Sequence, residues 1–292
     1  SWARDGVPLE MYLEYEGEYY NASTYGELAD KNVAYTYEEA QALTDEESDA
    51  VEIKVPVGRA EEIVRLVWDV EKRVSDMEEM RLGVQAISPM PELLSYWMEP
   101  GPADDLLRYI NDQIAEMVTH SNGRLVGLGA VPLQDIDRAI MELGRLKHQL
   151  GFAGIEIGSN VNGKPIGSPH FDAFFAEVEA LDMAVFVHAL RPCGMDRLVG
   201  PAPLQQVLAY PTDVGLAAAS VITSNLLLRR PRLRMAFSHG GGTLGLLLPR
   251  LQQGFQVFPA LQESVLESPA LQARRLYYDA LVYDDPTLLF TN

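Results

Sequence analysis

Two histidines follow apolar runs and are the first candidates for chemistry. His188 closes the run 183–187, and His239 follows the run 235–238 and precedes three glycines at 240–242. Apolar runs of this length fit buried parallel strands, and the C-terminal face of such strands is where α/β folds keep their active sites. Neutral imidazoles suit a divalent metal ion. The pattern therefore predicts a metal-assisted site, although for His188 a histidine bonded to a backbone carbonyl is an equal alternative.

His239 is either a ligand or a general acid/base, depending on its neighbours. The three glycines would let the backbone turn tightly and approach a ligand closely. Catalytic zinc usually has three protein ligands and water, and no His-x-His, His-Glu-x-x-His or Cys-x-x-Cys spacing supplies the rest. Glu156 and Asp279 are acidic candidates at strand ends, and Asp279 would equally well cap a loop.

Three further features have a functional and a structural interpretation. Cys193, five residues after His188, would line the site or fill space as a small buried side chain, and the buried filler is favoured. The loop 158–167 would cradle an anion or form a rigid turn, and the turn is favoured because no phosphate fingerprint is present. Arg250 would clamp a carboxylate or be a solvated arginine, which the pattern alone favours.

The elements that must position these residues alternate regularly. Strands are predicted at 84–88, 125–131, 153–157, 183–188, 233–238 and 276–280. Helices are predicted at 60–81, 103–119, 135–150, 171–181, 201–228 (with a break near Pro211) and 244–255. The alternation predicts right-handed βαβ units and a parallel sheet. A closed barrel has eight strands, so we expect the first and last strands to lie before Ser1 and after Asn292, and 1–292 to be one barrel domain.

The first 57 residues are acidic and rich in tyrosine. We interpret them as an excursion or lid-like insertion, with a short helix at Met11–Tyr15 and another near Tyr37–Leu43. Packing of the tyrosines on the barrel is favoured over contact with substrate.

Composition excludes several classes of partner. The net charge of −19 argues against nucleic acid and anionic membranes. No apolar segment approaches the roughly 20 residues that cross a bilayer, and we expect no signal peptide. A single cysteine suits a reducing compartment, so we expect a cytoplasmic protein.

Several motifs together resemble a known family. They are Phe237–Gly242, Phe186–His188, Gly158–Pro165, Ser95–Trp97 and Tyr277–Asp284. Between about Arg65 and Asn292 the chain resembles the amidohydrolase superfamily, in the amidohydrolase family 2 branch around aminocarboxymuconate-semialdehyde decarboxylase.

The resemblance implies a distorted (β/α)8 (TIM) barrel with one divalent metal, usually zinc, with manganese and iron as alternatives. It implies that His188 is a metal ligand and that His239 is the acid/base beside the metal-bound water. It also implies that Arg250 reaches the neighbouring subunit's site and holds a substrate carboxylate, with Arg65 as a loosely matched second carboxylate-binding residue.

We expect Trp97 and Arg191 to bind substrate as well. In close relatives a Pro-Trp pair follows the metal histidine, whereas here Ala189–Pro192 follows, so the aminocarboxymuconate substrate is not carried over. The His-x-His pair of the family's first strand and the aspartate of its last strand have no counterpart in the sequence.

The expected function is a metal-dependent lyase or hydrolase acting on a small carboxylate, with decarboxylation first. One alternative is a non-catalytic or half-site subunit of a hetero-oligomer. Another is a non-haem iron or manganese oxygenase on the same scaffold. The expected assembly is a homodimer or a hetero-oligomer with a related subunit.

Overall fold

A computed structural model describes residues 12–15, 18–21, 69–201 and 203–283. The chain forms two compact units, residues 1–82 with 199–204 and residues 83–198 with 205–292. The predicted helix near Tyr37–Leu43, the start of the predicted helix 60–81 and Arg65 lie outside the described residues. The assignment to one domain stays a prediction.

The described part of the first unit holds a hairpin and a helix. Strands β1 (Tyr12–Tyr15) and β2 (Glu18–Asn21) pair antiparallel. The helix predicted at Met11–Tyr15 is therefore wrong; tyrosine, frequent in this segment, favours strands. Helix α4 (Val70–Glu79) confirms the second half of the predicted helix 60–81, and the Asp69 side chain caps it by accepting from the Lys72 amide at 2.9 Å.

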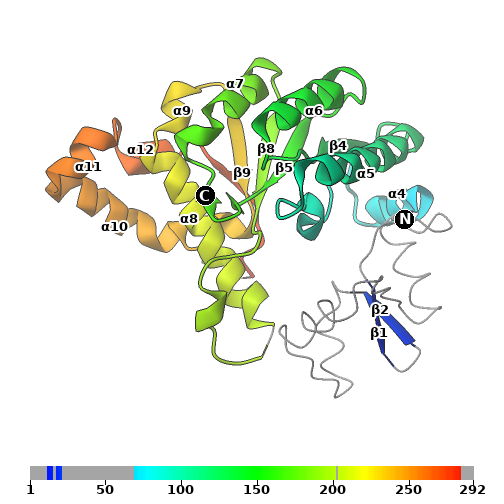
Figure 1. Cartoon of the computed structure of the whole chain (residues 1–292), viewed down its shortest axis with the longest axis horizontal. Helices are drawn as coiled ribbons and strands as arrows, with labels where there is room; N and C mark the ends of the chain where they lie inside the picture. Colours follow the sequence, from blue (N-terminus) through cyan, green and yellow to red (C-terminus); the bar gives the residue numbers. More distant parts are fainter. Residues whose placement is uncertain (1–11, 16–17, 22–68, 202, 284–292) are drawn as a thin grey trace. The chain divides into compact units, whose positions relative to one another are not determined.

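The second unit is built on a parallel sheet of six described strands (Figure 1). In spatial order they are β10 (Tyr277–Tyr278), β9 (Arg234–Phe237), β8 (Ala184–His188), β5 (Gly154–Gly158), β4 (Leu125–Gly129) and β3 (Gln85–Ile87). All six predicted strands are confirmed, and their spatial order follows the sequence. This is the arrangement of consecutive strands in a TIM-barrel-like fold.

Helices connect the strands. They are α5 (Pro100–His120), α6 (Ile136–His148), α7 (Asp172–Ala180), α8 (Tyr210–Thr223), α9 (Leu226–Arg229), α10 (Leu244–Val257), α11 (Pro259–Ser264) and α12 (Pro269–Ala273). Near Pro211, where a break was predicted, a π-helix (Gln205–Ala209) gives way to α8 at Tyr210. The proline lies in the first turn of α8, where its missing amide hydrogen costs nothing. The chain turns again at Asn225, whose φ of 59° is left-handed.

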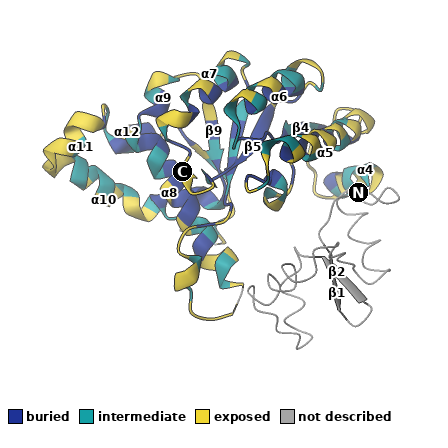
Figure 2. Ribbon diagram, in the orientation of Figure 1, coloured by how far each residue is buried: buried dark blue, intermediate teal, exposed yellow. Residues whose placement is uncertain are grey.

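The two faces of the sheet have different chemistry. The face toward the helices is apolar and buried; it carries Ile155, Ile157, Val185, Val187, Met235 and Phe237. Every residue of β5 is buried, and this strand is dark blue in Figure 2. Residues paired in parallel strands share a face, so Glu156, Phe186 and Ala236 lie together on the opposite face. His188 continues this second face at the end of β8.

Candidate active site

His188 and His239 lie at the ends of the adjacent parallel strands β8 and β9. Their ring centroids are 5.2 Å apart. The His188 Nδ1–H donates to the carbonyl oxygen of Ala189 at 3.1 Å, which in the neutral imidazole leaves the Nε2 lone pair for a ligand. The hydrogen bond to a backbone carbonyl is thus present, and it orients the ring so that the other nitrogen is free; the role of His188 as a metal ligand stays a prediction.

His239 combines a strained backbone with an unpaired buried nitrogen. Its φ of 55° is left-handed, which is uncommon for a residue other than glycine. Its Nε2 is buried and has no hydrogen-bond partner among the described residues. Burial lowers the pKa of His239 and the neighbouring His188 lowers it further, whereas Asp279 opposes the shift. Both burial and the neighbouring imidazole therefore disfavour the charged form of the His239 ring.

Two of the three glycines after His239 serve packing inside the protein. A side chain at Gly242 (φ 59°) would collide with the carbonyl oxygen of Pro211 in α8. At Gly241 (φ 76°) it would collide with the ring of Tyr278 in β10. The close approach expected for a ligand is thus, among the described residues, an approach of α8 and β10, and it fixes the loop that carries His239.

Asp279 caps this loop. Its Oδ1 accepts from the Gly240 amide at 2.7 Å and from the Leu281 amide at 3.1 Å. Of the two interpretations offered for Asp279, the hydrogen bonds support the loop cap, which holds the loop that carries His239.

Glu156 is a buried carboxyl group on the inner face of β5. It is 2% exposed, and its Oε1 has no partner among the described residues. Burial raises its pKa to about 8 and nearby Glu92 adds to the increase, whereas a hydrogen bond from Ser88 works against it. Glu156 is therefore a neutral acid at pH 7.

Asp213 on α8 organises the two loops beside His188. It accepts from the Ser159 hydroxyl, from the Asn160 side chain at 3.1 Å and from the Cys193 amide at 3.1 Å. Sequence reasoning missed this residue, because an aspartate inside a predicted helix resembles any solvated one. Cys193 itself is exposed, so its expected role as a buried filler is wrong; the backbone amide makes the structural contact.

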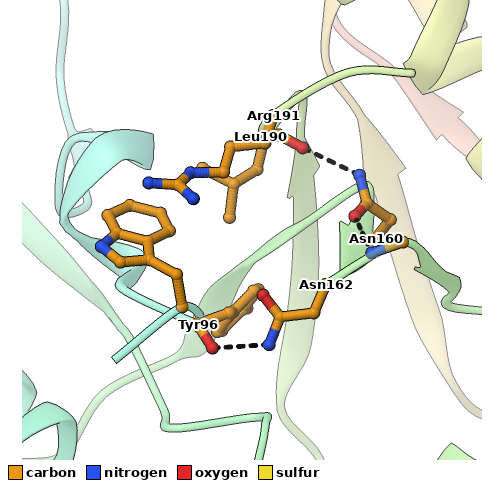
Figure 3. Close-up of a pocket in the computed structure, with 7 residues that line it drawn as sticks. Tyr96, Asn160, Asn162, Leu190 and Arg191 are labelled. Carbon is orange, nitrogen blue, oxygen red and sulfur yellow. Dashed lines mark hydrogen bonds between the residues drawn. The ribbon is translucent and has the colours of Figure 1, made fainter. Parts of the chain in front are cut away.

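A pocket of about 210 Å³ opens beside these loops (Figure 3). Its lining residues are Tyr96, Trp97, Asn160, Asn162, Gly163, Leu190 and Arg191. The Arg191 guanidinium lies over the Trp97 ring, 3.6 Å from its centroid. The structure thus brings together two of the four predicted substrate-binding residues.

The turn opposite Arg191 is a tight hairpin. Strands β6 (Asn160–Val161) and β7 (Lys164–Pro165) pair antiparallel across Asn162 and Gly163, whose φ values of 50° and 78° are both left-handed. These are the conformations that a two-residue type I′ turn requires. The rigid turn predicted for this loop is confirmed.

Arg250 lies away from this pocket. Arg250 is an exposed residue of α10 and does not line the pocket. Among the described residues no group of three or more His, Cys, Asp and Glu side chains could hold a metal ion. His188 and His239 lie side by side, and the metal-ligand role of His188 stays a prediction. No described helix is long and apolar enough to cross a membrane.

Comparison with known proteins identifies the family. The amidohydrolase family model matches residues 62–288. The chain belongs to this family. It is 35% identical over 224 residues to 2-amino-3-carboxymuconate-6-semialdehyde decarboxylase of Dictyostelium discoideum, covering 76% of the chain and 62% of the relative. It is 27% identical over 205 residues to γ-resorcylate decarboxylase of Rhodococcus jostii, covering 63% and 62%. The expected resemblance is thus confirmed, although the chain spans less than two thirds of the length of these relatives.

The fold agrees with this assignment. The structure superposes on 5-carboxyvanillate decarboxylase from Novosphingobium aromaticivorans, a structure with bound manganese, with a TM-score of 0.70 at 21% identity, covering 92% of the chain and 78% of that protein. The described sheet is accordingly part of a TIM-barrel-like fold.

Proposed function

We propose that this chain belongs to a metal-dependent decarboxylase that acts on a small planar carboxylate. The observation that carries the proposal is the pair of histidines at the ends of adjacent strands, 5.2 Å apart, with the Nε2 of His239 buried and unpaired. Relatives in the same family are decarboxylases. Hydrolysis has no comparable support among the relatives described above.

A divalent metal fits the donor chemistry of the site. His188, held through Nδ1 by the Ala189 carbonyl oxygen, would supply Nε2 as one ligand. A metal bound there would act as a Lewis acid that stabilises negative charge on substrate oxygens. Manganese and zinc both accept imidazole with carboxylate ligands; a relative of the same fold binds manganese.

His239 would move the proton. Decarboxylation replaces a carbon–carboxylate bond with a carbon–hydrogen bond, so a proton must reach the carbon atom that loses CO2. The Nε2 of His239 is buried without a partner, which suits a group that takes up a proton and delivers it to that carbon. The cap from Asp279 and the packing of Gly241 and Gly242 hold the ring in place.

The test uses the full-length protein purified with its metal. Metal content would be measured by mass spectrometry, and CO2 release would be measured with γ-resorcylate, 5-carboxyvanillate and 2-amino-3-carboxymuconate semialdehyde. We expect one divalent ion per chain, lost in His188→Ala, and activity lost in His239→Ala with the metal retained. Retention of the ion in His188→Ala would contradict the ligand assignment.

A half-site subunit is the second candidate. The observation that favours it is that the described residues supply no cluster of three metal-binding side chains. Such a subunit would bind metal substoichiometrically alone and would support CO2 release only after a related second chain is added. Stoichiometric metal and activity in the isolated protein would exclude it.

A further inference from the structure

Four aromatic rings follow one another at the end of the sheet that carries the two histidines. The ring centroids of Tyr210 and His239 are 6.4 Å apart, those of His239 and His188 are 5.2 Å apart, and those of His188 and Phe186 are 6.3 Å apart. Tyr210 is the first residue of α8 and is half-buried. It therefore stands beside the residue that we propose as the proton donor, and it has been given no role so far.

The backbone holds Tyr210 in this place. The carbonyl oxygen of the next residue, Pro211, accepts from the Thr243 amide at 3.0 Å, and a side chain at Gly242 would collide with the same oxygen. Because Gly242 and Thr243 belong to the loop that carries His239, the start of α8 is joined directly to that loop. Tyr210 cannot move away from His239 without breaking this contact.

The segment before Tyr210 has a rare conformation. Residues Gln205–Ala209 form a π-helix, and single π-helical turns occur frequently at functional sites. Apolar packing does not account for this turn, since Val207 and Leu208 are 65% and 51% exposed. The turn instead places Gln205 so that its side-chain amide donates to the Tyr210 hydroxyl oxygen at 3.2 Å.

The Tyr210 hydroxyl keeps a hydrogen to donate. A phenol both accepts and donates, and its oxygen already accepts from Gln205, whereas no described residue accepts its hydrogen. Burial raises the pKa of Tyr210 and nearby Glu92 raises it further, whereas the hydrogen bond from Gln205 opposes the shift. The hydroxyl is therefore a neutral donor at physiological pH, held in a fixed direction beside His239.

We propose that Tyr210 is a third functional residue of this site, and that its hydroxyl donates a hydrogen bond to the substrate oxygen that becomes negatively charged as CO2 leaves. The inference rests on the proposed decarboxylase function. When the carbon–carboxylate bond breaks, its electron pair stays on the substrate and is delocalised onto a conjugated oxygen. The proton from His239 then forms the new carbon–hydrogen bond, and the O–H bond of Tyr210 stays intact. A preorganised donor placed where charge develops lowers the barrier.

The first test separates kcat from KM in the full-length, metal-loaded protein. Tyr210→Phe is expected to lower kcat for CO2 release by about 10-fold or more and to change KM by less than about 2-fold, because the bond is strongest in the transition state. Gln205→Leu is expected to lower kcat about 3-fold in wild type and not to lower it further in Tyr210→Phe, because it acts through the same hydroxyl. The control is Tyr109→Phe in α5, a tyrosine that is 37% exposed, which is expected to keep wild-type values.

The second test measures binding without turnover. The probe is 4-nitrophenolate, a planar oxyanion that has no carboxylate to lose, and its binding would be followed by its absorbance. Wild type and Tyr109→Phe are expected to bind it about 5-fold or more tightly than Tyr210→Phe, as one hydrogen bond to a charged group implies. Equal affinities of wild type and Tyr210→Phe would overturn the oxyanion contact.

The kinetic test also has outcomes that contradict the proposal. An unchanged kcat in Tyr210→Phe, or a raised KM with kcat unchanged, would overturn the role in the transition state. The two proposals fail separately. A wild type that binds 4-nitrophenolate through Tyr210 but releases no CO2 contradicts only the decarboxylase, whereas CO2 release that is insensitive to Tyr210→Phe contradicts only the role of Tyr210.

Discussion

The Asp213 carboxylate in α8 accepts a hydrogen bond from the hydroxyl of Ser159, 54 positions away in the loop after β5. The same carboxylate accepts from Asn160 and from the Cys193 amide in the loop after β8. One side chain that is 5% exposed thus joins the two loops that carry the walls of the Arg191 pocket. Because its partners are partly or fully buried, its removal would leave them without an acceptor.

Asp213→Ala is therefore expected to lower the free energy of unfolding by about 3 kcal/mol, since several donors lose a charged acceptor at once. Urea denaturation followed by circular dichroism would measure the change. The matched control is Asp172→Ala, which removes the exposed ion pair with Arg229 and is expected to cost less than about 1 kcal/mol. Equal losses in the two variants would show that Asp213 does not anchor the loops.

The raised pKa of Glu156 is expected to make the stability of the protein depend on pH. Burial raises its pKa from the ordinary 4.5 to about 8 in the folded protein, so between these values the unfolded chain ionises while the folded chain keeps the proton. The contribution of Glu156 to the free energy of unfolding is fully present below about pH 4.5 and is lost as the pH rises to about 8. Above about pH 8 the free energy of unfolding no longer changes with the ionisation of this group. The loss is of order several kcal/mol, at about 1.4 kcal/mol per pKa unit.

Glu156→Gln is expected to remove this part of the profile, because an amide does not ionise. The variant would approach or exceed wild type in stability near pH 8 and show less advantage near pH 5, as measured by denaturation across the pH range. Glu116→Gln, an exposed glutamate of α5, is the control and is expected to follow wild type. Parallel profiles of wild type and Glu156→Gln would refute the assignment.

The parallel sheet was predictable because its strands are short apolar runs between helix-spaced patterns, and apolar periodicity is local information. The histidines could be found for the same reason, since each directly follows such a run. The cap by Asp279 was among the alternatives offered. By contrast, the anchor at Asp213 depends on contacts 20 to 54 positions away along the chain, which no local pattern records.

The structural role of the three glycines could also not be predicted without knowledge of the fold. Gly240–Gly242 predicted a close approach, but only the structure identifies what approaches, namely α8 and Tyr278. Trp97 lies in a motif that resembles the family, Arg191 in a segment that departs from it; both were expected to bind substrate, and their stacking was not predicted. Arg191 stands 94 positions after Trp97, and its left-handed backbone is a property of the loop that the residue type does not reveal.

Even a small side chain at Gly242 is expected to lower the free energy of unfolding strongly. Gly242→Ala would place a methyl group against the Pro211 carbonyl oxygen at a φ of 59°, and is expected to cost about 3 kcal/mol or more through overpacking and strain. Gly163→Ala is the matched control, because its φ of 78° is also left-handed but nothing lies within 4 Å of the added carbon. It is expected to cost only about 1 kcal/mol, as thermal denaturation would show.

In a dimeric decarboxylase in which Arg250 acts on the partner's site, two inactive variants are expected to complement each other. The residue is exposed on α10, and Leu246 and Leu247 on the same helix are 79% and 46% exposed, which suits a surface covered by a second copy. We expect His188→Ala and Arg250→Ala each to lose CO2 release. Mixing, dissociating and reassociating them would make heterodimers in which one of two sites has both residues intact. Random pairing makes half of the dimers mixed, so roughly a quarter of wild-type activity is expected.

The control is each variant dissociated and reassociated alone, which is expected to regain no activity. Recovery in the mixture requires both that Arg250 acts across the interface and that His188 acts within its own chain, because a residue pair within one chain could not be restored by exchange. Full activity of Arg250→Ala alone would show that this arginine is only a solvated surface residue. An inactive Arg250→Ala that no mixing restores would place its action within its own subunit.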